Sequence, residues 1–239
     1  MTDSKNYVIG LVIYPGMTAL DIVGPQQVFS GMPNVKIHRL WKNLEAISTD
    51  DGMKILPDTT FANCPTLDLI CVGGGLGQAA AVNDDEVIDF FRQQSKVKFI
   101  TSVCGGSEFL AKAGLLEGYR AGTHWMMRDR LAQLGVEVGT ERVVVDRALV
   151  SRYNGGNPHN ALTRNRYTGG GVTAGIDFAL TVAAALYGEE MAKMTQLAME
   201  YDPAPPFDVG SPEKAGSELV NKTIAYAQNL FKDKEASLS

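Results

Sequence analysis

Short runs rich in valine and isoleucine alternate along this chain with longer stretches whose apolar residues recur at helical spacing. Because strands buried on both faces read as continuous apolar runs, this order predicts a doubly wound α/β fold, a mostly parallel sheet flanked by helices. The expected strands are residues 7–14, 35–41, 67–72, 97–103, 136–138 and 142–146. The expected helices are residues 19–30, 84–95, 105–113, 125–134, 176–186, 189–201 and 218–231.

Three segments do not follow this alternation. Residues 44–62 contain several Asp, Gly and Pro residues and read as a strand pair or as loops. Residues 147–167 include turn formers and no apolar period, which predicts a long excursion of the chain. Prolines follow the helix expected at residues 189–201, so we expect a C-terminal arm over residues 202–239. Since no long polar linker is present, we expect a single domain over residues 1–239.

Composition excludes several functional classes. The chain has 239 residues with 45% apolar residues, a formal charge of −5 and three cysteines. Three cysteines are too few for a disulfide scaffold and indicate a reducing, cytoplasmic location. The acidic balance without a Lys/Arg block argues against nucleic acid or an anionic membrane as partner. Residues 1–6 are polar and no apolar stretch reaches the length of a bilayer span, so we expect neither a signal peptide nor a transmembrane helix.

The strongest local signal is a cysteine at the end of a buried strand. Cys104 follows the strand of residues 97–103 directly and precedes Gly105-Gly106 and an expected helix. A nucleophile elbow has this pattern, because the side chain must project from a sharp strand-to-helix turn between small neighbours. The helix N-terminus would lower the pKa of the thiol from about 8.5 and make Cys104 a thiolate nucleophile. The alternative is that Cys104 is a small buried hydrophobic residue.

The other two cysteines lack such a setting. Cys64 precedes a proline in a loop and Cys71 lies inside a strand, so we interpret both as structural. Their spacing and the absence of nearby histidines do not fit a zinc site, and we expect no metal.

Gly73-Gly74-Gly75 begins where the strand of residues 67–72 ends, the edge at which open α/β sheets bind ligands. The dinucleotide fingerprint fits poorly, because no helix opens on the third glycine and no acidic residue stands at the expected spacing. A backbone N–H of this loop would instead face Cys104 and donate to negative charge developing on a substrate. The alternative is a tight turn.

Two further polar residues are candidates for proton transfer. Asp21 lies among apolar neighbours, where a carboxylate either caps a helix or does proton chemistry, because burying it unpaired is costly. His124, next to Trp125, is the natural candidate base for a cysteine nucleophile, and a structural histidine is the alternative.

Taken together, several segments resemble the ThiJ/PfpI superfamily, a glutamine amidotransferase-like group with a doubly wound fold. These segments are residues 20–25, 73–75, 102–107, 113–116, 123–125 and 168–179. Within the superfamily the chain is similar to isonitrile hydratases, which act on compounds such as cyclohexyl isocyanide, and residues 197–211 support this. The likeness covers about residues 6–215. Sensor domains of some transcription regulators share several of the same motifs.

The resemblance implies roles for individual residues. The family's nucleophile falls on Cys104 and its acidic partner on Asp21, with Gly74, Gly75 and Gly105 as oxyanion or substrate-binding positions. In the implied reaction the Cys104 thiolate attacks the terminal carbon of a small-molecule isonitrile, Asp21 supplies a proton and a thioimidate forms. Water then adds and an N-substituted formamide leaves. The resemblance implies no cofactor, and a homodimer.

The chain departs from the isonitrile hydratases at two places. Gly105 stands where they have a threonine, so the backbone N–H survives while a hydroxyl near the sulfur or substrate is lost. Residues 148–164 are inserted where the family has a tight hairpin turn, as a lid or as a dimer contact. His124 matches a widespread superfamily motif and Thr173 lies in a matching segment, so both are kept as second-tier site candidates.

Two other functions are compatible with these residues. A glyoxalase or peptidase of the same fold would need His124 to act with Cys104. A redox or ligand sensor without catalysis would instead use an exposed Cys104 of low pKa that oxidises readily.

Overall fold

In the computed structural model, residues 6–148 and 164–238 are described. The chain divides into two compact units, Met1–Glu200 and Tyr201–Ser239. The second unit begins one residue before the arm expected at residues 202–239. The single domain over residues 1–239 stays a prediction. The predicted insertion at residues 148–164 lies, apart from its end residues, outside the described part of the chain.

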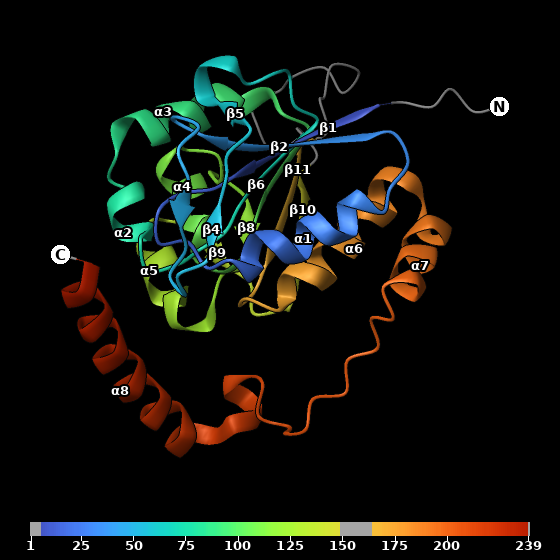
Figure 1. Cartoon of the computed structure of the whole chain (residues 1–239). Coiled ribbons are helices and arrows are strands. Elements are labelled where there is room, and N and C mark those ends of the chain that lie inside the picture. Colours follow the sequence, from blue (N-terminus) through green and yellow to red (C-terminus); the bar gives the residue numbers. More distant parts are fainter. Residues whose placement is uncertain (1–5, 149–163, 239) are drawn as a thin grey trace. The chain divides into compact units, whose positions relative to one another are not determined.

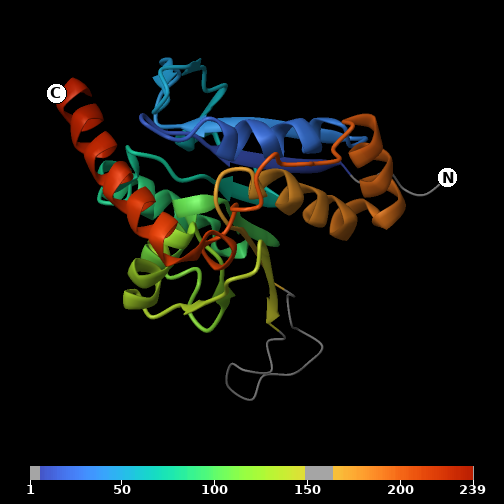
Figure 2. The same ribbon diagram turned by 90° about the horizontal axis from the view of Figure 1, so that it is seen from below.

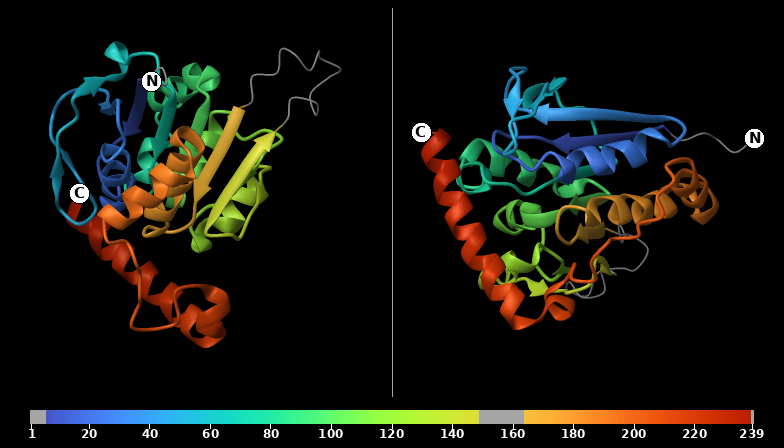
Figure 3. Two further views of the ribbon diagram at one scale, coloured as in Figure 1. Left: turned by 90° about the vertical axis from the view of Figure 1, so that its right-hand side faces the viewer. Right: turned by 60° about the horizontal axis from the view of Figure 1, so that its bottom comes forward.

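The centre of the first unit is a seven-stranded sheet in the order β10-β11-β7-β6-β1-β2-β5. Its strands are β1 (Tyr7–Val12), β2 (Val35–Trp41), β5 (Thr59–Thr60), β6 (Leu69–Val72), β7 (Phe99–Ser102), β10 (Val143–Ala148) and β11 (Arg164–Gly169). All neighbouring strands pair in parallel except β10 and β11, whose opposite directions are visible in the left view of Figure 3. The mostly parallel sheet expected from the apolar runs is confirmed.

Helices flank this sheet, as the doubly wound pattern predicts (Figure 1). They are α1 (Leu20–Ser30), α2 (Gln78–Ala81), α3 (Asp85–Gln93), α4 (Ser107–Lys112), α5 (Arg128–Gln133), α6 (Ala174–Tyr187) and α7 (Glu189–Ala198). α1 packs against α6, α3 against α4, and α7 against α6 (Figure 2). Two small sheets complete the unit: β3 (Ile47–Ser48) with β4 (Lys54–Ile55), and β8 (Arg120–Ala121) with β9 (Glu137–Val138).

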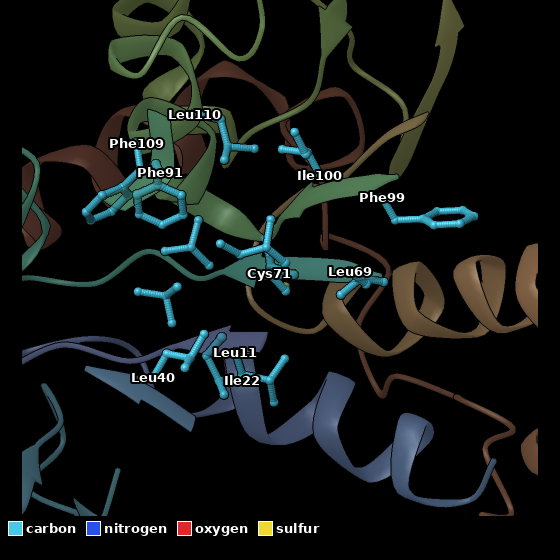
Figure 4. Close-up of a cluster of buried hydrophobic side chains, with 14 of the residues drawn as sticks. Leu11, Ile22, Leu40, Leu69, Cys71, Phe91, Phe99, Ile100, Phe109 and Leu110 are labelled. Atoms are coloured by element: carbon cyan, nitrogen blue, oxygen red, sulfur yellow. The ribbon is translucent and has the colours of Figure 1, made fainter. Parts of the chain in front are cut away.

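The core lies between the sheet and its helices. Every residue of β6 and β7 is buried. β6 accordingly reads as an unbroken apolar run, whereas β7 ends in two buried polar residues, Thr101 and Ser102. Figure 4 shows Phe91 of α3 and Phe109 of α4 beside the strand that carries Cys71, and their ring centroids are 5.7 Å apart. This packing holds β6 and β7 rigidly side by side, so the segments that leave their ends are fixed relative to each other.

The long excursion expected over residues 147–167 is wrong at its C-terminal end, where β11 begins at Arg164 and joins the sheet beside β7. The segment lacks an apolar period because Arg166 occupies a core position, only 2% exposed. Its Nε donates to the Leu115 carbonyl at 2.7 Å and its guanidinium lies 4.3 Å from the Tyr119 ring centroid. A paired cation thus replaces the apolar residue that periodicity requires.

Other boundaries shift by a few residues. The helix expected at residues 105–113 begins instead with a 3₁₀ turn, Cys104–Gly106, before α4. Residues 44–62 contain a short strand pair, as one of the two alternatives expected, and also β5, which joins the edge of the main sheet. Further 3₁₀ turns cover residues 61–63, 94–96 and 125–127.

The second unit consists of an extended segment followed by α8 (Pro212–Leu238), which is kinked at Gly216. This helix is longer than the one expected at residues 218–231. Within the described ranges, we find no helix with the length and apolar character needed to cross a bilayer.

Candidate active site

Two neighbouring strands bring the predicted site residues to one edge of the sheet. β6 and β7 are parallel, with Val72 opposite Ser102, so Gly73 and Val103 leave the same edge. Cys104 adopts a φ of +57°, a left-handed conformation that few residues other than glycine occupy. Its N–H donates to the Gly170 carbonyl at 2.8 Å, and its own carbonyl accepts from the Thr123 hydroxyl at 2.8 Å. The sharp strand-to-helix turn expected at Cys104 is therefore present, with the N–H and the carbonyl of Cys104 both hydrogen-bonded, and the role of Cys104 as nucleophile stays a prediction.

Asp21 is fully buried on α1 and points at the loop that follows β6. Its Oδ2 accepts a hydrogen bond from the Gly74 N–H at 2.6 Å. Its Oδ1 has no hydrogen-bond partner among the described residues. The side chain makes no capping hydrogen bond at the start of α1, so of the two sequence-based alternatives capping is wrong. A buried carboxyl oxygen left unpaired is available for proton transfer.

The Asp21 carboxyl and the Cys104 thiol are close enough to shift each other's pKa. Burial raises the pKa of Asp21 to about 7, and the nearby Asp50 adds to this. Hydrogen bonding from Gly74 and from the Cys104 side chain opposes the rise. Asp21 therefore exchanges protons near neutral pH, as a general acid and base must.

The expected thiolate is wrong for the resting site. Burial raises the pKa of Cys104 well above its ordinary value, and the charge of Asp21 raises it further. N–H groups of Val172 and Gly105 at the sulfur lower it without offsetting those two effects. The helix that was expected to stabilise a thiolate, α4, has only six residues and starts after a 3₁₀ turn. These effects favour the thiol over the thiolate at Cys104, next to the Asp21 carboxyl.

The three glycine positions differ in what they do. Gly74 uses its N–H to hold Asp21, so this N–H is committed to positioning the carboxyl instead of a substrate. A Cβ on Gly74 would lie 2.5 Å from the Gly105 nitrogen and 3.1 Å from Cys104 Sγ, which explains why only glycine fits. The Gly105 N–H is directed at the Cys104 sulfur. An oxyanion role for Gly75 stays a prediction.

The side chains of the second-tier candidates have other hydrogen-bond partners, and His124 contacts Cys104 through its backbone N–H, which donates to the Cys104 carbonyl at 3.3 Å. Nδ1 of His124 accepts from the Met126 N–H at 3.3 Å, and burial lowers the pKa of its ring, with Arg128 adding to the effect. Thr173 is exposed just before α6, and its hydroxyl accepts from Arg142 Nη2 at 3.3 Å. The interpretation of His124 as a structural histidine is favoured.

Sequence reasoning missed two contributors. The Val172 N–H reaches the Cys104 sulfur, and the glycine run that precedes α6 was the signal for such a close approach. Tyr14 lies just beyond β1, fully buried, and its hydroxyl donates to the Gly73 carbonyl at 3.1 Å. Burial raises the pKa of Tyr14, and the charges of Asp21 and Cys104 raise it further, so the phenol stays protonated.

The remaining cysteines lie elsewhere. Cys71 is buried inside β6 and Cys64 is half-buried in a loop, and burial raises their pKa values to about 12 and about 11. Among the described residues, no three His, Cys, Asp or Glu side chains gather into a group that could hold a metal ion.

Comparison with known proteins agrees with this geometry. The sequence pattern of the DJ-1/PfpI family matches residues 8–162, more than half of the chain. The chain belongs to the DJ-1/PfpI family. An isonitrile hydratase from Pseudomonas putida is 43% identical over 90% of this chain and 87% of its own length. The HTH-type transcriptional regulator GbdR of Pseudomonas aeruginosa is 28% identical over 77% of this chain but only 48% of the regulator.

Solved structures give the same result. A ThiJ/PfpI family protein from Pseudomonas syringae superimposes with a TM-score of 0.84 and 38% identity, covering 97% of this chain and 90% of the other. Drosophila melanogaster DJ-1beta shares the fold, with a TM-score of 0.69 and 22% identity over 82% of this chain and 98% of its own. Both structures therefore have the fold described above.

Proposed function

We propose that this protein is an isonitrile hydratase, which adds water to an organic isonitrile to give an N-substituted formamide. The observation that carries the proposal is the pairing of Cys104, on its strained elbow, with the buried Asp21 carboxyl whose pKa lies at about 7. The 43% identity to the P. putida enzyme over 90% of the chain supports the same activity.

The chemistry requires both groups. An isonitrile carbon accepts a soft nucleophile such as sulfur, but the carbon then carries negative charge unless it is protonated. The Asp21 carboxylate takes the thiol proton as the Cys104 sulfur bonds to the terminal carbon, and it returns that proton to the carbon. The product of this step is a thioimidate, R–N=CH–S, on Cys104.

Hydration completes the cycle through the same carboxyl. Asp21 accepts a proton from a water molecule as the water oxygen bonds to the thioimidate carbon, and this proton passes to the imidate nitrogen. The C–S bond of the tetrahedral adduct then breaks, the sulfur recovers a proton from the adduct's hydroxyl, and R–NH–CHO leaves. The Cys104 thiol and the Asp21 carboxylate are both regenerated, and the sum is one isonitrile plus one water.

The proposal also includes expectations about cofactors, oligomeric state and location. The nucleophile needs no cofactor, because the thiol and the carboxyl supply both bond formation and proton transfer. The homodimer and the cytoplasmic location implied by the sequence stay predictions. The alternative enzymes need His124 beside Cys104, and a redox sensor needs a thiol of low pKa. The contacts of His124 do not favour the alternative enzymes. The raised pKa of Cys104 does not favour the redox sensor.

Turnover of cyclohexyl isocyanide and of several linear alkyl isonitriles tests the proposal directly. Purified protein is expected to release the formamide, detected by proton NMR, and in D₂O the formyl carbon should carry deuterium because Asp21 delivers an exchangeable proton. Cys104→Ala serves as the negative control. If the wild type hydrates none of these isonitriles, the proposed function is wrong.

A further inference from the structure

The space in which residue 105 would carry a side chain is already filled. A Cβ placed on Gly105 would lie 1.9 Å from Oε1 of Gln78 and 2.8 Å from its Cδ, far closer than real atoms approach. The Gln78 carboxamide therefore sits against the residue that follows the nucleophile. Gln78 is the first residue of α2, a helix that the sequence did not predict, and nothing in the sequence pattern singled it out.

The carboxamide cannot simply swing aside, because a buried network holds it. Its Nε2 donates to Glu108 Oε2 at 2.6 Å, and both side chains are buried, with 5% of Gln78 and 4% of Glu108 exposed. Oε1 of Glu108 accepts from Arg130, from Nε at 2.8 Å and from Nη2 at 2.6 Å. Displacing Gln78 would leave a buried amide and one oxygen of a buried carboxylate without their hydrogen bond.

The network also fixes which end of the amide faces the site. The Glu108 oxygens accept from Arg130 and from Nε2 of Gln78, so the NH₂ group of Gln78 faces Glu108. The carbonyl oxygen consequently faces Gly105, in agreement with the close approach of Oε1.

The same residues join the two strand ends that build the site. The Gln78 N–H donates to the Gly75 carbonyl at 3.1 Å, which ties α2 to the glycine loop after β6. Glu108 lies on α4, which follows Cys104 after one 3₁₀ turn. The hydrogen bond from Gln78 to Glu108 thus connects the loop that holds Asp21 with the helix that follows the nucleophile.

We propose that Gln78 is a positioning residue of the Cys104 site. Its carboxamide, oriented by Glu108 and Arg130, substitutes for a side chain at position 105 and holds the Gly105 peptide so that its N–H points at the Cys104 sulfur. Gln78 acts through Gly105 and need not touch the substrate. The expected effect of Gln78 on isonitrile turnover rests on the proposed function, whereas its expected effect on the alkylation of Cys104 does not.

A double-mutant cycle between Gly105→Ala and Gln78→Ala tests this proposal. Gly105→Ala adds only the clashing Cβ, and we expect it to slow alkylation of Cys104 by iodoacetamide by about tenfold, as residues in direct contact couple strongly. In the Gln78→Ala background the clash is gone, and the same change should slow alkylation less than about twofold. Peptide mass spectrometry after limited reaction reports Cys104 separately from Cys64 and Cys71.

Two additional readouts separate positioning from a merely structural role. Gln78→Ala alone should move the pH dependence of Cys104 alkylation to higher pH, because the Gly105 N–H that lowers the thiol pKa loses its support. For isonitrile turnover, Gly105→Ala should lower kcat by more than it changes KM. Gln78→Met, which fills similar volume without the hydrogen bond, should show the pH shift of Gln78→Ala.

Gly106→Ala is the matched control. A Cβ at Gly106 would lie 2.2 Å from the Val72 carbonyl oxygen, a backbone atom that Gln78 does not influence. Gly106→Ala should therefore lower the melting temperature and the rate of Cys104 alkylation by the same amounts with and without the Gln78 side chain. By contrast, the melting temperature of the Gly105→Ala protein should rise when Gln78 is replaced by alanine.

The proposal is overturned if Gly105→Ala changes Cys104 alkylation and melting temperature equally in both backgrounds, or if Gln78→Ala leaves the alkylation pH profile in place. Absence of isonitrile turnover by the wild type would contradict the proposed function instead, because alkylation requires no isonitrile.

Discussion

Cys71 and Cys104 are chemically identical side chains on neighbouring parallel strands, and they differ in almost everything that decides reactivity. Cys71 lies inside β6, opposite Thr101 of β7, in regular extended backbone. Cys104 stands two residues past the end of β7 with a φ of +57°. The first occupies the interior of the sheet and the second its edge, where open α/β sheets place their ligands.

Burial does not distinguish these two thiols, because it raises the pKa of both. Their neighbours do. The charge of Asp21 raises the pKa of both thiols, but Cys104 also hydrogen-bonds with the Asp21 carboxyl and has the N–H groups of Val172 and Gly105 at its sulfur, whereas Cys71 hydrogen-bonds with Thr101. A raised pKa alone makes a thiol inert. In the proposed function, the Asp21 carboxyl, with a pKa of about 7, takes the thiol proton of Cys104 and so makes this buried thiol the nucleophile.

Exchange of each cysteine for alanine gives the largest expected contrast. Cys104→Ala removes the atom that bonds to the isonitrile, and turnover should fall by about 10³-fold or more, to the level of the uncatalysed reaction. Cys71→Ala should leave kcat/KM within about threefold and cost roughly 1 kcal/mol in urea unfolding, as a small core deletion does. Loss of activity in a well-folded Cys71→Ala protein would contradict the assignment of Cys71 as structural.

Asp21→Asn tests the carboxyl that hydrogen-bonds with Cys104. The amide is nearly isosteric and can still accept from the Gly74 N–H, but it cannot carry a proton, so kcat should fall by about 10²- to 10⁴-fold. Asp50→Asn is the control. It removes the nearby charge that raises the pKa of Asp21, and should keep most activity while moving the acidic limb of the pH profile to lower pH. Equal losses in both variants would argue against proton transfer by Asp21.

Asp21→Asn should also change how the free energy of unfolding depends on pH. The pKa of Asp21 is about 7 in the folded protein against 3.8 for the free side chain, so folded molecules bind this proton more tightly. The stabilisation of the folded protein by this proton is complete below about pH 4 and is lost as the pH rises through 7. It amounts to about 4 kcal/mol, at 1.36 kcal/mol for each unit of pKa difference. Asn at position 21 does not titrate. The stability of Asp21→Asn relative to wild type should thus grow from pH 4 to pH 8 in urea unfolding, and a flat difference would refute the raised pKa.

His124→Ala should have the smallest effect. The ring caps a 3₁₀ turn through the Met126 N–H, and the backbone N–H of His124 donates to the Cys104 carbonyl at 3.3 Å, so these contacts are those of a structural residue. We expect kcat within about threefold of wild type, a change no larger than a modest structural adjustment produces. A loss comparable to that of Asp21→Asn, measured by the formamide assay, would restore the alternative enzymes that need His124.

Much of the fold could be predicted because it depends on local pattern. The unbroken apolar run of β6 reflects burial on both faces, and the expected starts of α1 and α6 lie within two residues of the observed ones. β11 escaped prediction because Arg166 is buried through contacts with Leu115 and Tyr119, residues about fifty positions away. No window along the sequence contains that information.

The parts of the site that could be predicted are likewise those with a signal in the local sequence. The strand–Cys–Gly–Gly pattern identified Cys104 and the apolar setting identified Asp21, since both signals are local. The roles of Gly74 and Gln78 were not predictable, because the first depends on α1 lying beside the loop after β6 and the second on α2 lying beside α4. Proximity between segments distant in sequence appears only after folding.

By itself the sequence determined the doubly wound sheet, the elbow at Cys104 and the pairing of a thiol with a carboxyl, because hydrophobic period, turn chemistry and family motifs are written along the chain. Only the tertiary structure decided the protonation state. The sequence predicted a thiolate from a helix N-terminus, whereas burial and the Asp21 carboxyl raise the pKa of Cys104 and keep it a thiol. Desolvation and charge act through space, so they are set by what surrounds the sulfur and not by what precedes and follows it in the chain.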